Sequence, residues 1–479
     1  MYRTQSSVPA LAIVAALALG ACQESAPTEA SSRMLAASAA SLESSGRYVV
    51  VFSAERVPVD FGDRVAALGG SMQSALDSIG VASVTGLSEG AATELAGAAD
   101  VRAVEPDVAT APPNEDVGAD VATADGAVID LFAAADATAS PTTAQFYARQ
   151  WNLRAVFAPE AWAAGFLGSR DVVVAILDTG IDYTNPDLVG LVDLDRSISF
   201  VPEDVTRHYP GRLPFSDLFW HGTAAASIVA SNAKLVAGVN RYVTLLAVKV
   251  ADSTNTHTAD RLIRGIVYAA DQGADVINVS RGSQRDKSQS PGTVAAFERA
   301  VNYAFRKGAL VVSVPFNDAA DLDHNGDLVR LPCEAANAIC VSATGPTAAA
   351  GFNGPWENVD AIAPYSAFGR SAISVAAPGG IMAPPGYRTV WLPCTTTPTQ
   401  TTALDCRTGK PLQRGVGTSW AAPTVAGLAA LLVAQLGHGN PGLIRARILQ
   451  SADDLGEPGD DPHYGKGRIN IARALGVIP

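Results

Sequence analysis

Three short motifs in this chain of 479 residues carry side chains that together can cleave an acyl bond. They are Asp178-Thr-Gly, His221-Gly-Thr and Gly-Thr-Ser419. A serine hydroxyl is a poor nucleophile and needs a base, such as histidine, to take its proton. The base in turn needs a carboxylate that holds its tautomer and stabilises the imidazolium. Each motif alone is common, but all three in this order predict acyl-transfer chemistry.

The elements that must position these residues follow from apolar periodicity. A continuous apolar run, typical of a parallel strand buried on both faces, covers residues 172–177, and largely apolar runs of the same style cover residues 245–250, 276–279, 310–314, 339–343 and 373–376. Helical patterns lie between them at residues 221–230, 260–272, 292–307 and 419–435. The alternation predicts a parallel sheet with helices on both faces. Asp178 then ends a strand at the sheet edge where α/β enzymes work, and His221 and Ser419 open helices.

The residues around the motifs are similar to those of the subtilisin-like serine proteases, the subtilases. The similarity includes Asp178-Thr-Gly-Ile-Asp182, Asn185-Pro-Asp187-Leu and Gly417-Thr-Ser-Trp-Ala-Ala-Pro423. It implies a three-layer α/β/α subtilisin-like domain with a mostly parallel sheet at residues 150–479. It also implies a serine endopeptidase that forms an acyl-enzyme, in which Ser419 attacks, His221 acts as base and then acid, and Asp178 orients His221. The substrates would be polypeptides, and no cofactor is expected for catalysis.

The resemblance also assigns an oxyanion hole, because acyl transfer needs hydrogen-bond donors fixed in advance around the negative oxygen. Asn317 follows the strand-like run at residues 310–316, where subtilases carry an asparagine donor. The backbone N–H of Ser419 would be the second donor. The alternative is that Asn317 only begins the turn Asn317-Asp318.

Four residues are assigned to substrate binding by the same resemblance: Ser280, Arg281, Gly282 and Phe316. Arg281 stands where subtilases usually carry leucine, and it either favours acidic or polar substrate side chains or points outward to water. Phe316 stands where glycine is usual, so its ring is expected to narrow or reshape the primary pocket. Trp420 stands where methionine is usual.

These departures support a second hypothesis, a catalytically weak surface binding protein on a subtilase scaffold. The presence of all four catalytic positions opposes it. A carboxyl protease of related fold with a serine-glutamate-aspartate set is excluded, because His221 stands where that set needs glutamate.

The resemblance further suggests structural calcium. Asp187 and Asn232 match positions of a family site, with carbonyl oxygens expected from the loop at residues 231–236. Asp321, Asp323 and Asn325 resemble the start of an EF-hand loop, although the glutamate expected at its twelfth position is missing. A polar surface turn is the alternative there. Zinc is not expected, since the histidines and cysteines lack its usual spacing.

Residues 47–107 show a different pattern. Strand-like runs at 47–53, 81–84 and 101–105 and helical segments at 63–68 and 88–96 predict a small α+β ferredoxin-like domain. Its end resembles the end of subtilisin propeptides, which implies an intramolecular inhibitor and a zymogen that processes itself. Many other small α+β domains share this pattern.

Residues 108–149 are predicted to be an acidic linker that contains the maturation site. The segment from Glu105 to Ala148 holds eight acidic residues and no lysine or arginine, as is typical of solvated, disordered chain. Its charge explains much of the net charge of −13, which argues against nucleic-acid binding. The 48% of hydrophobic residues is enough for a sizeable core elsewhere.

The N-terminus predicts export. An apolar run at residues 10–21 is shorter than the roughly 20 residues that span a bilayer, so it indicates a signal peptide. It ends in Leu-Gly-Ala-Cys22, which resembles the bacterial lipobox, whose cysteine is acylated. Residues 1–22 are then a lipoprotein signal peptide and residues 23–46 a flexible tether. The protein would be a cell-envelope lipoprotein held at the membrane by its lipid, or released after maturation; the alternative is an ordinary signal peptide.

The other four cysteines allow three disulfide pairings. Local pairing, Cys333 with Cys340 and Cys394 with Cys406, is expected, because it closes two surface loops in an oxidising compartment. Cys22 is then the odd cysteine, used by the lipid.

Overall fold

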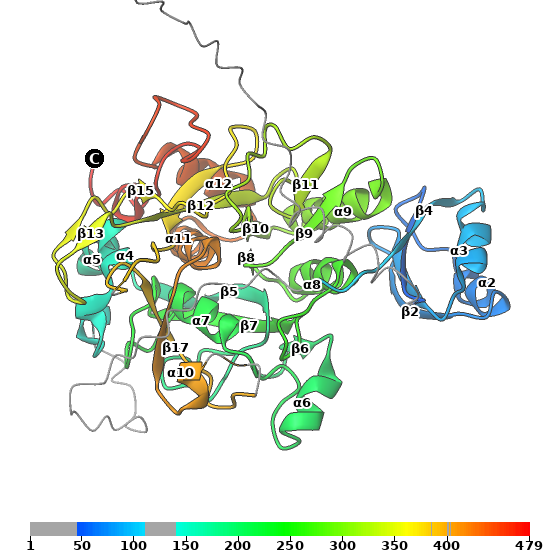
Figure 1. The fold of residues 1–479 in the computed structure, drawn as a ribbon, viewed down its shortest axis with the longest axis horizontal. Helices are drawn as coiled ribbons and strands as arrows, with labels where there is room; N and C mark the ends of the chain where they lie inside the picture. The colour runs from blue at the N-terminus through cyan, green and yellow to red at the C-terminus, as the bar shows by residue number, and fades with distance from the viewer. Residues whose placement is uncertain (1–45, 111–139, 385, 400–401, 403) are drawn as a thin grey trace, which may run out of the picture. The chain divides into compact units, whose positions relative to one another are not determined.

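The computed structural model describes residues 46–110, 140–384, 386–399, 402 and 404–479, and Figure 1 shows their elements. The predicted signal peptide, its lipobox residue Cys22, nearly all of the tether and residues 111–139 of the linker lie outside the described residues.

The small N-terminal domain is a four-stranded antiparallel sheet with two helices. Its elements are β1 (Tyr48–Phe52), α2 (Phe61–Ala67), β2 (Ser71–Leu76), β3 (Val81–Thr85), α3 (Glu89–Ala96) and β4 (Val101–Pro106). The strand order β2-β3-β1-β4 with a helix after β1 and after β3 is the expected ferredoxin-like arrangement. Sequence patterns missed β2, because this edge strand is largely exposed and lacks alternating apolar residues.

Alternate residues of β1 face two different cores. Val50 and Phe52 pack with Phe61 and Val65 of α2 inside the small domain. Val49 and Val51 belong instead to a core shared with the large domain. Because successive strand residues point to opposite faces, one short strand serves both cores.

The large domain is built on an eight-stranded sheet. Seven strands follow the order β15-β12-β10-β8-β5-β7-β6, and the eighth, β16, pairs with β12. Their bounds are β5 (Gly168–Asp178), β6 (Ile198–Ser199), β7 (Tyr242–Lys249), β8 (Val276–Val279), β10 (Leu310–Ser313), β12 (Ile339–Gly345), β15 (Ala361–Ile362) and β16 (Val375–Pro378). Only β15 pairs antiparallel, so the predicted mostly parallel sheet is confirmed.

Helices cover both faces of this sheet, which confirms the three-layer α/β/α class (Figure 1). One core holds α8 (Ala259–Asp271) and α9 (Pro291–Arg306) against Val173, Ala175 and Leu177 of β5. The other core holds α7 (His221–Val229), α11 (Thr418–Leu436) and α12 (Pro441–Gln450) against Val172, Val174 and Ile176. The helix α11 is long and apolar enough to cross a membrane, but it is mostly buried within the protein, as a core helix is.

The large domain has further helices and strands outside this sheet and the helices named above. They are α4 (Trp151–Ala155), α5 (Ala158–Ala163), α6 (Pro202–His208), β9 (Ser283–Asp286), β11 (Leu328–Leu331), β13 (Ala348–Ala349), β14 (Trp356–Glu357), β17 (Val390–Pro393), α10 (Leu404–Arg407), β18 (Leu412–Gly415) and α13 (Ile471–Ala474).

Both described ends of the predicted linker belong to folded structure. Thr110 forms an antiparallel bridge with His257. Two short 3-10 helices, η1 (Pro141–Thr143) and η2 (Tyr147–Arg149), precede α4, and the side chain of Phe146 between them is buried. Glu105 and Asp107, which we counted with the solvated acidic segment, are 8% and 4% exposed. Both ends of the segment at residues 108–149 are thus anchored to folded structure, which an average composition does not reveal.

Candidate active site

Asp178 and His221 meet in the interior of the large domain. Asp178 is the last residue of β5 and His221 the first residue of α7. His221 Nδ1 lies 2.8 Å from each carboxylate oxygen of Asp178, and both side chains are fully buried. Gly222 permits this approach, since a Cβ there would lie 2.1 Å from the carbonyl oxygen of Gly180. The predicted contact between these two residues is present in the structure.

The Asp178 carboxylate has two further partners on Oδ1. The backbone N–H of Thr179 donates to it over 2.7 Å, and Arg281 donates from Nε at 3.2 Å and from Nη2 at 2.8 Å. Burial alone would raise the pKa of Asp178, but the charges of Arg281 and His221, with their hydrogen bonds, outweigh it and hold this pKa well below its usual range.

The position of Arg281 corrects both predictions made for it. Its guanidinium faces neither a substrate pocket nor water, because it is paired with Asp178 and the residue is 3% exposed. A buried carboxylate attracts an arginine within reach, whereas a leucine at this position could not form an ion pair or a hydrogen bond with it. Sequence reasoning weighed the neighbours of Arg281 along the chain and not the carboxylate across the sheet.

Ser419 lies in the first turn of α11, next to the segment that carries Arg281. The Ser419 hydroxyl donates to the carbonyl oxygen of Ser280 over 3.4 Å, and the Ser280 hydroxyl donates to the carbonyl oxygen of Ser419 over 3.0 Å. The Ser280 side chain, which was assigned to substrate binding, thus forms a hydrogen bond within the protein. The ring of Trp420 packs on His221 with 4.7 Å between ring centroids. Ser280 and Arg281 therefore connect the start of α11 with Asp178, and Trp420 connects the start of α11 with His221.

Asn317 and the start of α11 form a pair of donors. The Asn317 side-chain oxygen accepts hydrogen bonds from the N–H and the hydroxyl of Thr418, both over 2.9 Å. Because the side-chain oxygen is the acceptor, the NH₂ group of Asn317 is the part of this side chain that can donate hydrogen bonds. A Cβ placed on Gly417 would lie 3.4 Å from that amide nitrogen and 3.6 Å from the backbone nitrogen of Ser419. Both donors thus border one small space, which the absence of a side chain at Gly417 keeps open.

Phe316 closes the space beside Gly282. A Cβ on Gly282 would lie 2.5 Å from the ring of Phe316, so the ring rests directly on that backbone. The guanidinium carbon of Arg330 lies over the Phe316 ring, 4.9 Å from the ring centroid. Phe316 has φ of +82°, a conformation that costs a residue with a side chain about 1–2 kcal/mol. Glycine would adopt it freely, which agrees with the glycine expected at this position from the resemblance.

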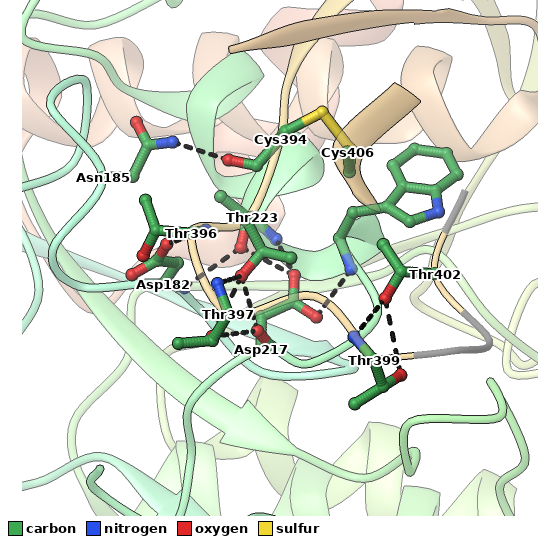
Figure 2. Close-up of a disulfide and its surroundings, with 12 residues drawn as sticks. Asp182, Asn185, Asp217, Thr223, Cys394, Thr396, Thr397, Thr399, Thr402 and Cys406 are labelled. Carbon is green, nitrogen blue, oxygen red and sulfur yellow. Dashed lines mark hydrogen bonds between the residues drawn. A yellow bond between two sulfur atoms is a disulfide. The ribbon is translucent and has the colours of Figure 1, made fainter. Parts of the chain in front are cut away.

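A disulfide-closed loop holds the segment before His221 (Figure 2). The structure pairs Cys394 with Cys406, and the hydroxyls of Thr395 and Thr397 donate to the backbone carbonyl of Asp217 over 2.7 Å and 3.1 Å. The Asp217 carboxylate accepts from the N–H of Thr223 at 2.9 Å and from its hydroxyl at 2.6 Å, which caps the first turn of α7.

The same loop contacts the segment that follows Asp178 (Figure 2). The carbonyl oxygen of Cys394 accepts from the Asn185 amide over 2.9 Å, and the N–H of Thr396 donates to Asp182 over 2.6 Å. The loop thus joins the segments next to Asp178 and His221. Sequence analysis missed this role of Asp217; its place four residues before His221 was the available signal. The second predicted pair, Cys333 with Cys340, is also present and joins the segment after β11 to the start of β12.

The first calcium site does not fit the residues present. The Asp187 carboxylate is fully buried and accepts hydrogen bonds from the N–H groups of Lys234, Leu235 and Val236 over 2.8–3.2 Å. Asn232 is bound to Arg241 and to backbone carbonyls. The loop at residues 231–236 thus turns N–H donors toward Asp187, where calcium would need carbonyl oxygens. Burial raises the pKa of Asp187 to about 6, although these donors oppose the shift.

The second calcium site does not fit either. The Asp321 carboxylate contacts His324 at 2.9 Å, whereas Asp323 accepts hydrogen bonds from Arg370 and Ser371 on another loop. The two carboxylates and Asn325 therefore do not form one ligand set. Within the described ranges, no three or more His, Cys, Asp or Glu side chains are grouped to hold a metal ion.

Comparison with known proteins finds relatives over the large domain. Residues 169–467 match the profile described as "Subtilase family". Thermitase from Thermoactinomyces vulgaris is 33% identical over 342 residues, which are 70% of this chain and 99% of thermitase. Subtilisin E from Bacillus subtilis (strain 168) is 28% identical over 327 residues, 68% of this chain and 70% of the relative.

Two solved structures have the same fold. A lanthipeptide protease aligns with a TM-score of 0.58 and 26% identity, covering 69% of this chain and 96% of its own. The epidermin leader peptide processing serine protease from Staphylococcus aureus aligns with a TM-score of 0.66 and 21% identity, covering 90% of this chain and 98% of its own.

The environment of Asp187 yields a prediction about stability and calcium. Asp187→Ala is expected to lower the free energy of unfolding by at least about 3 kcal/mol, since each buried N–H left without an acceptor costs about 1–3 kcal/mol. Urea unfolding should give this loss equally in EDTA and in millimolar calcium. The exposed Asp171→Ala should change stability by less than about 0.5 kcal/mol. A wild-type stability that rises with calcium, with the rise absent in Asp187→Ala, would contradict our assignment.

Proposed function

The chain belongs to the subtilase family and is a serine-type endopeptidase, and we propose that Asp178, His221 and Ser419 perform its chemistry. The buried contact between Asp178 and His221 carries this proposal. Ser419 supports it through its place at the start of α11, beside Trp420, which packs on His221.

In the proposed reaction the Ser419 hydroxyl attacks the carbonyl carbon of a peptide bond. His221 takes the hydroxyl proton, and Asp178 stabilises the resulting imidazolium. The amide of Asn317 and the N–H of Ser419 donate to the oxyanion. His221 then protonates the leaving amine, an acyl-enzyme remains, and a water molecule deprotonated by His221 releases the acid.

The proposed substrate preference follows from Phe316. Its ring rests on Gly282, in the segment that the family resemblance assigns to the primary pocket. The pocket should therefore accept small side chains on the acyl side of the cleaved bond, and larger ones should meet the ring. The acidic or polar preference predicted through Arg281 is withdrawn, because its guanidinium binds Asp178.

The small domain is proposed to be an inhibitory propeptide that the enzyme removes from itself. Glu105 accepts hydrogen bonds from the N–H groups of Gly292 and Thr293 at the start of α9, over 2.6 Å and 2.7 Å. Asp107 accepts from the N–H of Asp260 at the start of α8, over 3.1 Å. Carboxylates are favoured at helix N-termini, where N–H groups lack partners within the helix.

The chain beyond the small domain leads toward the candidate active site. Thr110 and His257 exchange two backbone hydrogen bonds of 2.8 Å and 2.9 Å, and the ring of His257 lies 2.9 Å from the carbonyl oxygen of Gly282. An extended segment paired in this way can present the following residues for cleavage. We place the self-cleavage site in the linker at residues 108–149.

Export is proposed from the N-terminal segment. The two disulfides use four of the five cysteines and suit an oxidising compartment. Cys22 remains for acylation, which would anchor a bacterial envelope lipoprotein. Cleavage in the linker would free the peptidase domain from this anchor and release it outside the cell.

The first test is covalent labelling. The wild-type protein should react with a fluorophosphonate probe at Ser419, and Ser419→Ala should lose the label and at least about 10⁴-fold of peptidase activity. Ser371→Ala, which removes an exposed serine hydroxyl, should label normally. An intact wild-type protein that never labels at Ser419 would instead favour a binding protein on this scaffold.

The second test is self-processing. Expressed alone in protease-deficient cells, the wild-type chain should be cut between the small and large domains, and N-terminal sequencing should place the cut in residues 108–149. Ser419→Ala should stay uncut, because no nucleophile is present. Normal processing of this variant would show that another protease performs the cut.

The third test concerns the pocket. Phe316→Gly should raise kcat/KM at least about 10-fold for a substrate with phenylalanine on the acyl side, and change it little for alanine, since discrimination by a few methylenes is worth about 10–200-fold. Phe316→Leu keeps a bulky group and should give a smaller gain. Equal effects on both substrates would show that Phe316 does not border the pocket.

A further inference from the structure

Arg281 is a buried cation that the reaction described so far does not use. Its side chain is 1% exposed and that of Asp178 is fully buried. Two of its nitrogens, Nε and Nη2, bind the same oxygen, Oδ1 of Asp178. An arginine is costly to bury, so its presence next to the candidate catalytic carboxylate calls for a physical explanation.

The hydrogen bonds at Asp178 are concentrated on one oxygen, Oδ1. Oδ1 receives Thr179 N–H and Arg281, while Nδ1 of His221 lies between Oδ1 and Oδ2. Rotation of the carboxylate would break the contacts on Oδ1. Arg281 therefore restrains the plane in which Asp178 meets His221.

Arg281 also brings a positive charge close to the imidazole. Nη2 of Arg281 and Nδ1 of His221 both lie 2.8 Å from Oδ1, so they are within about 6 Å of each other. The indoles of Trp220 and Trp420 pack against His221, and both are buried. Neutral rings exclude water there, which leaves the charge of Arg281 weakly screened.

We propose that Arg281 is a positioning residue that aligns Asp178 with His221 and keeps His221 unprotonated at lower pH, so that the peptidase works in more acidic surroundings. The proposal rests on the proposed roles of Asp178 and His221. A cation near the ring opposes formation of the imidazolium, whereas Asp178 favours it. Only the unprotonated ring can accept the Ser419 proton, so activity persists to a lower pH when Arg281 is present.

The other charged groups around Asp178 are already engaged. His257 binds the carbonyl oxygen of Gly282, and burial lowers its pKa to about 4, so it adds no charge near neutral pH. Lys249 of β7 binds the carbonyl oxygen of Thr179 and pairs with Asp204 at 3.2 Å. Asp217 caps α7 through Thr223. We therefore test the pH range of the peptidase activity by substitution of Arg281.

The experiment compares pH profiles of kcat/KM for the processed enzyme on one small-residue peptide substrate, and it compares KM for this substrate with KM for a matched peptide that carries acidic side chains. In Arg281→Leu the midpoint of the acidic limb should move up by about 1–2 pH units, the shift expected from a unit charge about 6 Å away at intermediate dielectric. Arg281→Lys keeps the charge and should move the midpoint by less than half as much. Arg196→Leu removes an arginine that pairs with Asp193 and should leave the profile unchanged.

Two further measurements keep the proposal testable. If Arg281→Leu fails to fold, Arg281→Gln, which can donate a hydrogen bond without charge, should show the same upward shift. Titration of the His221 ring by NMR in protein carrying labelled histidine should show that shift without any need for turnover. If the wild type neither labels nor cleaves, the proposed function fails, and this titration still decides the effect of Arg281.

Three outcomes would overturn the proposal. One is an acidic limb that stays in place or moves down in Arg281→Leu. Another is an equal shift in Arg281→Leu and Arg281→Lys, which would make the effect steric. The third is an unchanged profile with an altered KM only for substrates with acidic side chains, which would return Arg281 to substrate recognition.

Discussion

The buried carboxylate of Asp178 is the constraint on which the candidate active site depends. A charge removed from water needs hydrogen bonds and an opposite charge, and loss of one partner from a buried pair costs about 3–5 kcal/mol. Thr179, His221 and Arg281 supply these partners from three different segments. Displacement of any one segment would leave Asp178 without a partner. The site therefore also connects β5, α7 and the residues after β8.

The surrounding structure holds this site from several sides. The loop closed by Cys394 and Cys406 binds the segments next to Asp178 and His221, and Asp217 caps α7. Ser280 binds the first turn of α11. On the opposite face of the sheet, Glu105 and Asp107 of the small domain bind the first turns of α9 and α8. Carboxylates thus engage the N-terminal turns of three helices, which agrees with the unpaired donors that helix starts present.

Much of the fold followed from apolar periodicity, because strands and helices that are buried carry strong patterns. The strand predicted at residues 276–279 and the helix predicted at 260–272 lie within one residue of β8 and α8. The exposed strand β2 carries no such pattern and was missed. The ordered residues 140–149 were assigned to a linker, since composition averages over a few buried anchors such as Phe146. The ligand sets expected for calcium are not assembled in the structure, because residue types do not tell whether a loop directs its carbonyl or its N–H groups inward.

The sequence by itself determined the class of chemistry, since Asp178, His221 and Ser419 stand in local motifs whose order and neighbours are informative. It also determined the alternation of strands and helices, and it favoured the local cysteine pairing that the structure contains. Only the tertiary structure decided the direction of Arg281, the partners of Asp187 and the position of the Phe316 ring over Gly282. The reason is physical: a side chain is oriented by charges and packing from segments far along the chain, and these are absent from the few residues that surround it in sequence.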